Sequence, residues 1–227
     1  SFGCHENYLL RRSRDFREMA DALIAFFVTR QIIAGSGALV QDEDGTVRYS
    51  LSARAAQMHD ALSGATTRSR PIINTRDEPL SDSTSYRRLH VIVGDTNIAE
   101  PTTALKVAST DVVLHAMETG TDFSDLALAD PMGAIRQISL DLGGQTAVKL
   151  SDGREMTAAQ IQREIRRRAL KALGDEEVTE LYSYLFDVWD RALNAIDSRD
   201  WSGTDTEIDY AIKKRLVDAY VARTGAD

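Results

Sequence analysis

The chain has 227 residues, of which 43% are hydrophobic and 27% charged, a composition typical of a folded globular protein. The net charge of −8 argues against a non-specific nucleic-acid-binding surface. A single cysteine, Cys4, excludes an internal disulfide framework and fits a reducing compartment. The most apolar run, at 22–28, is too short to span a membrane. We therefore expect a cytoplasmic protein that binds neither nucleic acid nor membranes.

The first half of the chain alternates between strand and helix patterns. Apolar residues at three-and-four spacing predict a helix over about 14–33, with Ser13 as its N-cap and Gly35 after it. Short runs with β-branched and aromatic residues, separated by turn residues, predict strands. These strands are expected at 1–10, 38–41, 46–52, within 68–79, and at 86–95.

The second half is mostly helical. Pro101 is well placed for the first turn of a helix that runs to about Glu118. A shorter helix at 132–141 and a hairpin around SDG at 151–153 follow. From Thr157 onward the pattern predicts helices over about 157–173, 175–196 and 204–223. The expected organisation is an α+β fold, with a sheet-based part over residues 1–155 and a helical part of the same large domain over 156–227.

Three of the expected strands carry polar side chains that alternate in position with apolar ones. Successive side chains of a strand point to opposite faces, so GCHENY at 3–8 places His5 and Asn7 on one face. Cys4, Glu6 and Tyr8 then share the other face. In YRRLHVIVGD at 86–95, the pattern directs the leucine and valines toward a core and Arg88 and His90 away from it.

The segment RSRPIINTRDEP at 68–79 adds a third polar face if it forms one unbroken strand. Its side chains on that face are Arg68, Arg70, Asn74, Arg76 and Glu78. Guanidinium groups hold phosphate and carboxylate oxygens through paired hydrogen bonds and neutralise charge during phosphoryl transfer. Imidazole and carboxylate groups together can hold a divalent ion that bridges nucleotide phosphates. Such a surface suits phosphate transfer from ATP to an acid.

Simpler interpretations compete with this one. A histidine on a strand is often only a hydrogen-bonded structural residue, and arginines near a sheet edge often form solvated ion pairs. The GSG sequence at 35–37 lacks the lysine of a P-loop, and neither zinc-type Cys/His spacing nor a Gly-x-Ser-x-Gly elbow is present. The residues alone therefore leave an enzyme and a binding module equally open.

Four segments resemble a known family. GCHENYLL at 3–10, ATTRSRPIINTRDEP at 65–79, the segment 86–107 and TEIDYAIKKRL at 206–216 resemble the Pup ligase/Pup deamidase family, in order along the chain. This family belongs to the glutamine-synthetase-like carboxylate–amine ligases. TTRSRP and the cysteine before HENY are more similar to the ligase branch. The resemblance implies part of a glutamine-synthetase-like antiparallel sheet with packed helices, followed by a helical C-terminal stretch.

The resemblance also implies an activity and assigns residues to it. A Pup–protein ligase uses ATP and Mg²⁺ to phosphorylate the side chain of the C-terminal glutamate of Pup, a small protein tag. A lysine of a target protein then attacks to form an isopeptide bond. The residues implied are Arg68 and Arg76 for catalysis, Arg70, Asn7, Arg88 and His90 for cofactor binding, and His5 and Glu78 for the metal.

The chain departs from the family pattern at both ends. It matches neither the early segment that holds the metal-binding glutamates and the aspartate base nor the small C-terminal domain. We therefore expect the middle part of a ligase, inactive alone, whose partners are Pup, lysine-bearing targets and the N-terminal segment of the same enzyme. The alternatives are a part of the sister deamidase/depupylase, or a non-catalytic module that binds Pup or nucleotide.

Overall fold

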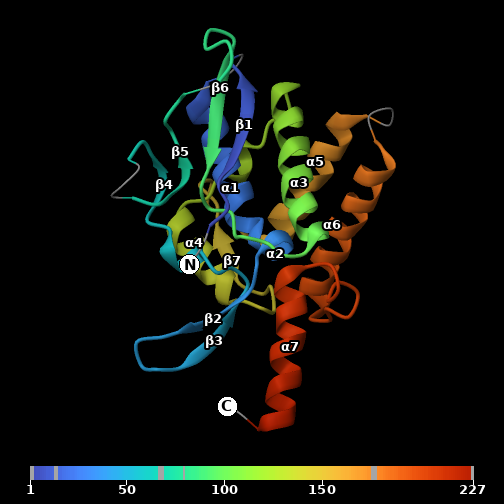
Figure 1. Ribbon diagram of the computed structural model, residues 1–227. Coiled ribbons are helices and arrows are strands. Elements are labelled where there is room, and N and C mark those ends of the chain that lie inside the picture. The colour runs from blue at the N-terminus through green and yellow to red at the C-terminus, as the bar shows by residue number, and fades with distance from the viewer. Residues whose placement is uncertain (1–2, 13–14, 66–68, 79, 175–177, 226–227) are drawn as a thin grey trace.

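The computed structural model describes residues 3–12, 15–65, 69–78, 80–174 and 178–225, in which helices pack behind a four-stranded sheet (Figure 1). The strand order is β1-β6-β5-β4, with β1 and β4 at the edges. The bounds are Glu6–Arg11 for β1, Asp60–Ser63 for β4, Pro71–Asn74 for β5 and Tyr86–Val91 for β6. The expected α+β class is confirmed.

The strand pairing corrects one detail of that expectation. Strands β1, β6 and β5 are antiparallel, as expected, but β4 joins β5 in parallel. The sequence pattern predicts no strand over β4, because its four residues DALS lack the β-branched and aromatic side chains that favour strands. Pairing with β5 supplies the hydrogen bonds that this short segment needs.

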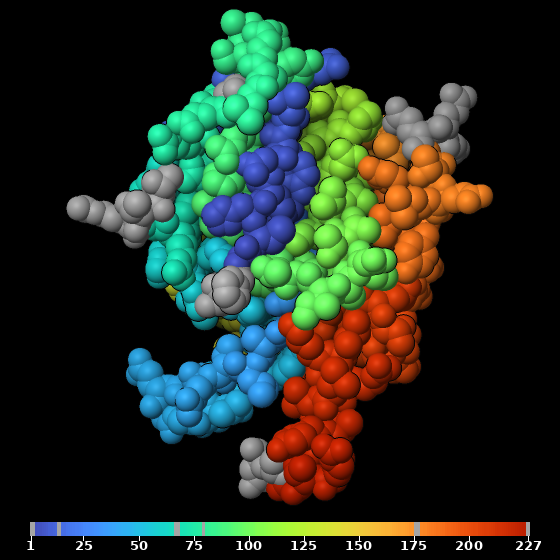
Figure 2. Space-filling view, in the orientation of Figure 1, coloured from blue at the N-terminus to red at the C-terminus, as the bar shows by residue number. Residues whose placement is uncertain are grey.

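Two separate hairpins flank the sheet. One pairs β2 (Ala38–Gln41) with β3 (Val47–Ser50), and the other pairs β7 (Ala147–Lys149) with β8 (Glu155–Thr157). The β2–β3 hairpin projects from the body of the molecule near the last helix, as Figure 2 shows. Both hairpins were expected from their turn residues.

The helices build the layer behind the sheet, with α1 directly behind the strands and α3, α5 and α6 beside it (Figure 1). The expected single helix over 14–33 is divided at Arg30 into two helices, α1 and α2. Asp15 caps the N-terminus of α1, where its side chain accepts hydrogen bonds from the N–H groups of Arg17 and Glu18. The expected cap Ser13 lies outside the described residues. The bounds are Phe16–Thr29 for α1, Gln31–Ala34 for α2, Glu100–Glu118 for α3, Pro131–Leu140 for α4, Ala158–Leu173 for α5, Glu180–Ser198 for α6 and Asp209–Thr224 for α7.

The core lies between the sheet and these helices. Leu89 and Val91 of β6 and Phe26 and Phe27 of α1 belong to one buried apolar cluster. Burying such side chains is worth about 1.5–3 kcal/mol each, so one face of the sheet is fixed against α1. Across the described part of the chain, no helix is both long and apolar enough to cross a membrane. The opposite face of β1 is exposed, and the candidate site lies there (Figure 2).

Candidate functional site

The register between β1 and β6 sets the exposed face. Asn7 lies opposite His90, and on the other face Glu6 lies opposite Val91. Glu6 and Leu10 are buried, whereas His5, Asn7 and Leu9 are exposed, which confirms the predicted alternation. Arg88 reaches across the strands and its Nε donates to Asn7 Oδ1 at 2.7 Å. The three predicted residues Asn7, Arg88 and His90 therefore share one surface.

His5 also reaches this surface and contacts His90. His5 Nδ1 and His90 Nε2 lie 3.3 Å apart, and the two rings meet edge to face with centroids 5.1 Å apart. Burial, followed by the positive charges of Arg54 and Arg88, lowers the pKa of His5. Burial, Arg88 and His5 lower the pKa of His90 to about 4. Both imidazoles are therefore neutral at pH 7.

The third polar strand is shorter than expected. Strand β5 ends at Asn74, whose Oδ1 accepts a hydrogen bond from the N–H of Arg76 at 2.9 Å. This turn ends the two-residue alternation, so the condition for a third polar face, one unbroken strand through RSRPIINTRDEP, is not met. Arg76 instead forms a 2.9 Å ion pair with Glu78, and both side chains are more than half exposed.

Of the remaining predicted residues, Glu78 borders the same surface. Glu78, Asn7 and Arg88 line one surface hollow with a volume of about 490 Å³. Arg70 donates from Nη1 to Gln57 Oε1 and precedes β5. Arg68 lies outside the described residues. The structure thus brings His5 into contact with His90 and Asn7 into contact with Arg88, and it places Glu78 in the lining of the hollow.

Arg54 is a site residue that the sequence analysis missed. It is only 5% exposed, and its guanidinium packs so closely over Gly3 that a Cβ there would collide with it. Burial lowers the pKa of Arg54, and so does the charge of Arg70, against the opposing effect of Asp95. Its Nε makes no hydrogen bond with any described residue. A lone arginine in LSARAAQ gives no sequence pattern, because only the fold brings this loop beside His5.

A buried ion pair supports β1 from the opposite face. Arg30 donates to both oxygens of Glu6, from Nη1 at 2.8 Å and from Nη2 at 2.6 Å. Tyr8 donates to the same carboxylate at 2.6 Å, and Arg30 also donates to Thr110 Oγ1 at 2.7 Å. Burial by itself raises the pKa of Glu6, but the charge and hydrogen bonds of Arg30 outweigh it, so the net pKa is lowered. Glu6 separates His5 from Asn7 in sequence, so this pair anchors the strand that carries both.

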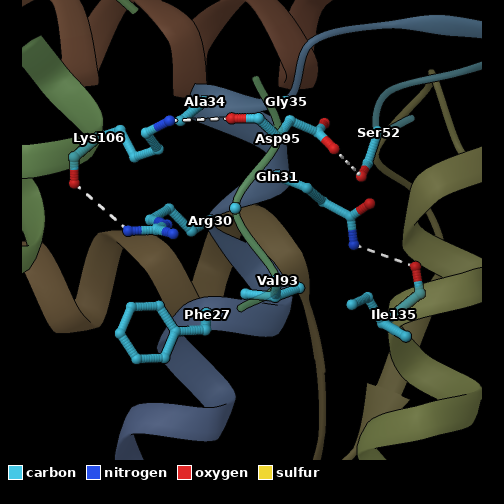
Figure 3. A pocket seen from close by; sticks show the side chains of 11 residues that line it. Phe27, Arg30, Gln31, Ala34, Gly35, Ser52, Val93, Asp95, Lys106 and Ile135 are labelled. Atoms are coloured by element: carbon cyan, nitrogen blue, oxygen red, sulfur yellow. Dashed lines mark hydrogen bonds between the residues drawn. The ribbon is translucent and has the colours of Figure 1, made fainter. Parts of the chain in front are cut away.

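A small polar cavity adjoins the ion pair, with Arg30, Gln31, Asp95 and Lys106 on its walls (Figure 3). Lys106 Nζ donates to the carbonyl oxygen of Asp95 at 2.9 Å, and Asp95 accepts from Ser52 Oγ at 3.0 Å. The cavity volume of about 20 Å³ is the size of one water molecule. This space is too small for a substrate, so the candidate site remains the exposed face of the sheet.

The exposed face suits anionic oxygens. Arg54 and Arg88 lie close enough to shift the pKa of His5, and Arg70 lies close enough to shift that of Arg54. Guanidinium groups of this kind hold phosphate and carboxylate groups, so the donor set fits the phosphates of a nucleotide.

The same residues fit Mg²⁺ poorly. That ion requires several oxygen ligands in near-octahedral geometry. Within the described residues no group of three or more His, Cys, Asp or Glu side chains is arranged to hold a metal ion. The Nδ1 atom of His5 faces a nitrogen of His90 rather than an oxygen, and Glu78 is paired with Arg76.

Comparison with known proteins decides the family. Residues 1–227 match the model of a protein family described as Pup-ligase protein. The chain belongs to this Pup-ligase family. It is 52% identical over 220 residues to a protein named Pup–protein ligase from Saccharomonospora viridis, covering 97% of this chain and 48% of that protein. A Pup–protein ligase from Jonesia denitrificans is 52% identical over 228 residues, covering 99% and 49%.

Two solved structures of family members have the same fold. The Pup ligase PafA in complex with ADP superposes with a TM-score of 0.88 at 45% identity, covering 100% of this chain and 51% of that one. PafA in complex with Pup gives 0.87 at 43% identity, covering 100% and 46%. The chain of this Pup-ligase family member thus spans about half the length of the relatives it matches.

Proposed function

We propose that this chain supplies part of an ATP-dependent Pup–protein ligase, which joins the C-terminal glutamate side chain of Pup to a lysine of a target protein. The observation that carries the proposal is the pair of neutral imidazoles bordered by Arg54 and Arg88 on an exposed sheet face. The similarity to PafA bound to ADP, and to PafA bound to Pup, supports a nucleotide and Pup as ligands.

In this proposal the arginines hold oxygen atoms. Arg88 is oriented by its bond to Asn7, which leaves its terminal nitrogens to donate to a phosphate or carboxylate. Arg54, held against Gly3, supplies a second fixed positive charge beside His5. Fixed donors of this kind stabilise charge that develops in the transition state, because they require no reorganisation. Arg68, Arg70 and Arg76 keep the phosphate-facing roles that the family resemblance implies.

ATP would supply the phosphoryl group that activates the glutamate carboxylate for attack by the lysine. The attacking amine must first lose a proton, since the pKa of lysine is about 10.4. No residue of this chain matches the family's aspartate base. We therefore propose that the base and the oxygen ligands for Mg²⁺ come from the part of the relatives that this chain does not cover.

Within the chain, we propose that 1–155 and 156–227 form one large domain, supported by the packing of α5 and α6 on α3. The single cysteine supports a cytoplasmic location.

The test uses the chain extended to the full length of its relatives. Labelled Pup, ATP, Mg²⁺ and a lysine-bearing target are incubated, and conjugates are measured on gels. We expect Arg54→Gln and Arg88→Gln each to slow conjugation by roughly a hundredfold, the scale for one lost transition-state donor. Arg48→Gln is the matched control, because Arg48 pairs with Asp42 on the β2–β3 hairpin.

The results separate the candidate functions. Wild-type rates in both site variants would refute the assigned roles. Release of Pup from conjugates without their formation would favour the sister deamidase/depupylase. Binding of Pup or nucleotide with neither reaction would favour a non-catalytic module. We expect the 227-residue chain alone to form no conjugate, and robust conjugation by it would show that the base lies within this chain.

A further inference from the structure

We propose that Asp95 is a positioning residue, which holds the loop at 52–55 in the conformation that places Arg54 beside His5. Asp95 lies just after β6 and is only 4% exposed, so it can act on a substrate only through other residues. The inference rests on the function proposed above for Arg54. Its structural part can be tested without any ligase reaction.

The carboxylate of Asp95 joins three segments of the chain. Its Oδ2 accepts hydrogen bonds from the N–H of Ser36 at 2.8 Å and from the N–H of Ala53 at 3.2 Å. Its Oδ1 accepts a hydrogen bond from the Ser52 hydroxyl at 3.0 Å, which Figure 3 shows beside the small polar cavity. The carboxylate therefore ties the segment after α2 and the start of the loop to the end of β6.

Ser52 extends this restraint to the backbone of Arg54. The Oγ of Ser52 accepts hydrogen bonds from the N–H groups of Arg54 and Ala55, both at 3.1 Å, while its own hydrogen is donated to Asp95. A hydroxyl group has one donor and two acceptor lone pairs, so all three are in use. Arg54 directly precedes a short 3-10 helix, Ala55–Gln57, and its backbone is thus held at both ends.

The guanidinium of Arg54 is held in the same region. It packs over Gly3, and Gly3 forms an isolated β-bridge with Asp95. Burial lowers the pKa of Arg54, and the negative charge of Asp95 opposes that effect. Lys106 Nζ donates to the carbonyl oxygen of Asp95 at 2.9 Å, which anchors the backbone of Asp95 to α3. Asp95 thus restrains both the backbone and the side chain of Arg54.

An amide at position 95 cannot satisfy this network. Asp95→Asn keeps the shape of the side chain but replaces one acceptor oxygen with a donor. In the place of Oδ2, the amide nitrogen would face the N–H groups of Ser36 and Ala53. In the place of Oδ1, it would face a hydroxyl oxygen whose lone pairs already accept from Arg54 and Ala55. Either orientation leaves buried donors without an acceptor, so we expect the loop to loosen.

The structural test is NMR of the 227-residue chain with ¹⁵N-labelled arginine. The heteronuclear NOE of the Arg54 side-chain Nε–H group, assigned by its loss in Arg54→Gln, measures how firmly the guanidinium is held. We expect Asp95→Asn and Ser52→Ala each to lower it toward the value of exposed arginines. The matched control is Asp44→Asn, which should leave it unchanged, because Asp44 accepts from the N–H of Thr46 on an exposed turn.

The functional test is a double-variant cycle in the chain extended to the length of its relatives. Asp95→Asn should slow conjugation of Pup by roughly tenfold to a hundredfold, the scale for a misplaced group. In the Arg54→Gln background the same change should cost less than about twofold, since the residue that it positions is already lost. A residue that only stabilises the fold would slow both proteins by the same factor.

Thermal unfolding of each variant shows whether it remains folded, and Ser52→Ala, which keeps the carboxylate, decides the matter if Asp95→Asn does not fold. An Arg54 signal that stays ordered in either folded variant would overturn the proposal, as would equal slowing in both arms of the cycle. Loss of order in the folded variants, with wild-type order in Asp44→Asn, would support positioning by Asp95. Wild-type conjugation by Arg54→Gln would refute the function proposed for Arg54 and leave that structural result intact.

Discussion

Neutralising Glu6 should destabilise the chain strongly. Glu6→Gln keeps the shape of the side chain but leaves the Arg30 guanidinium buried beside a neutral amide. The side chains of Arg30 and Glu6 are 3% and 5% exposed, so water replaces little of the lost interaction. Removing one partner of such a buried pair costs about 3–5 kcal/mol, because the remaining charge is uncompensated. For a domain of this size that corresponds to a fall in Tm of roughly 6–20 °C.

The assay is thermal and urea unfolding at pH 7, followed by far-ultraviolet circular dichroism. Asp218→Asn is the matched control: it removes the carboxylate of the exposed Lys214–Asp218 pair, which is worth at most about 1 kcal/mol. In the double variant Glu6→Gln/Arg30→Met no unpaired charge is buried, so it should recover much of the loss. A Glu6→Gln chain that unfolds within about 1 kcal/mol of wild type would refute the reasoning, since it would show that the pair is open to water.

The pH dependence follows from the same pair. Because the folded-state pKa of Glu6 is lowered, its contribution to stability is complete above the pKa of the unfolded chain. That contribution is lost as the pH falls through the lower folded-state value. Wild type should therefore lose stability on acidification below about pH 4.3 more steeply than the double variant does. Parallel curves for the two proteins would contradict this assignment.

Two further predictions concern the exposed face. The folded-state pKa of His90, about 4, lies below its ordinary value of 6.5. Between these two pH values His90 is protonated in the unfolded chain but not in the folded one. The stability of the folded chain therefore falls as the pH is lowered from 6.5 to 4. His90→Gln should flatten the stability curve over that range, and an unchanged curve would argue against a neutral His90. Strand β1 is an edge strand and Leu9 is 54% exposed, which favours association with other chains. Leu9→Lys should reduce self-association in sedimentation velocity at high concentration, and a wild-type chain that stays monomeric there would refute the prediction.

Local patterns in the sequence were sufficient for much of the fold. The two-residue alternation placed His5 and Asn7 on the exposed face of β1 and Arg88 and His90 on that of β6, because strand geometry is set by adjacent residues. Helix periodicity with Pro101 and Gly174 located the long helices to within a few residues, except that α6 begins at Glu180 and α7 at Asp209, each five residues later than expected. The family resemblance supplied the chemistry that alternation alone left open.

Tertiary structure decided the composition of the site. The sequence could not show that β5 ends at Asn74, since a side-chain hydrogen bond to Arg76 there competes with strand pairing. It could not place Arg54 beside His5, or Arg30 beneath Glu6, because these contacts join segments 24 or more residues apart. Local sequence determines which face of a strand each side chain occupies. Packing between distant segments determines the burial of a side chain and the charges around it. Those two properties decide whether a histidine is neutral and whether an arginine is held in place.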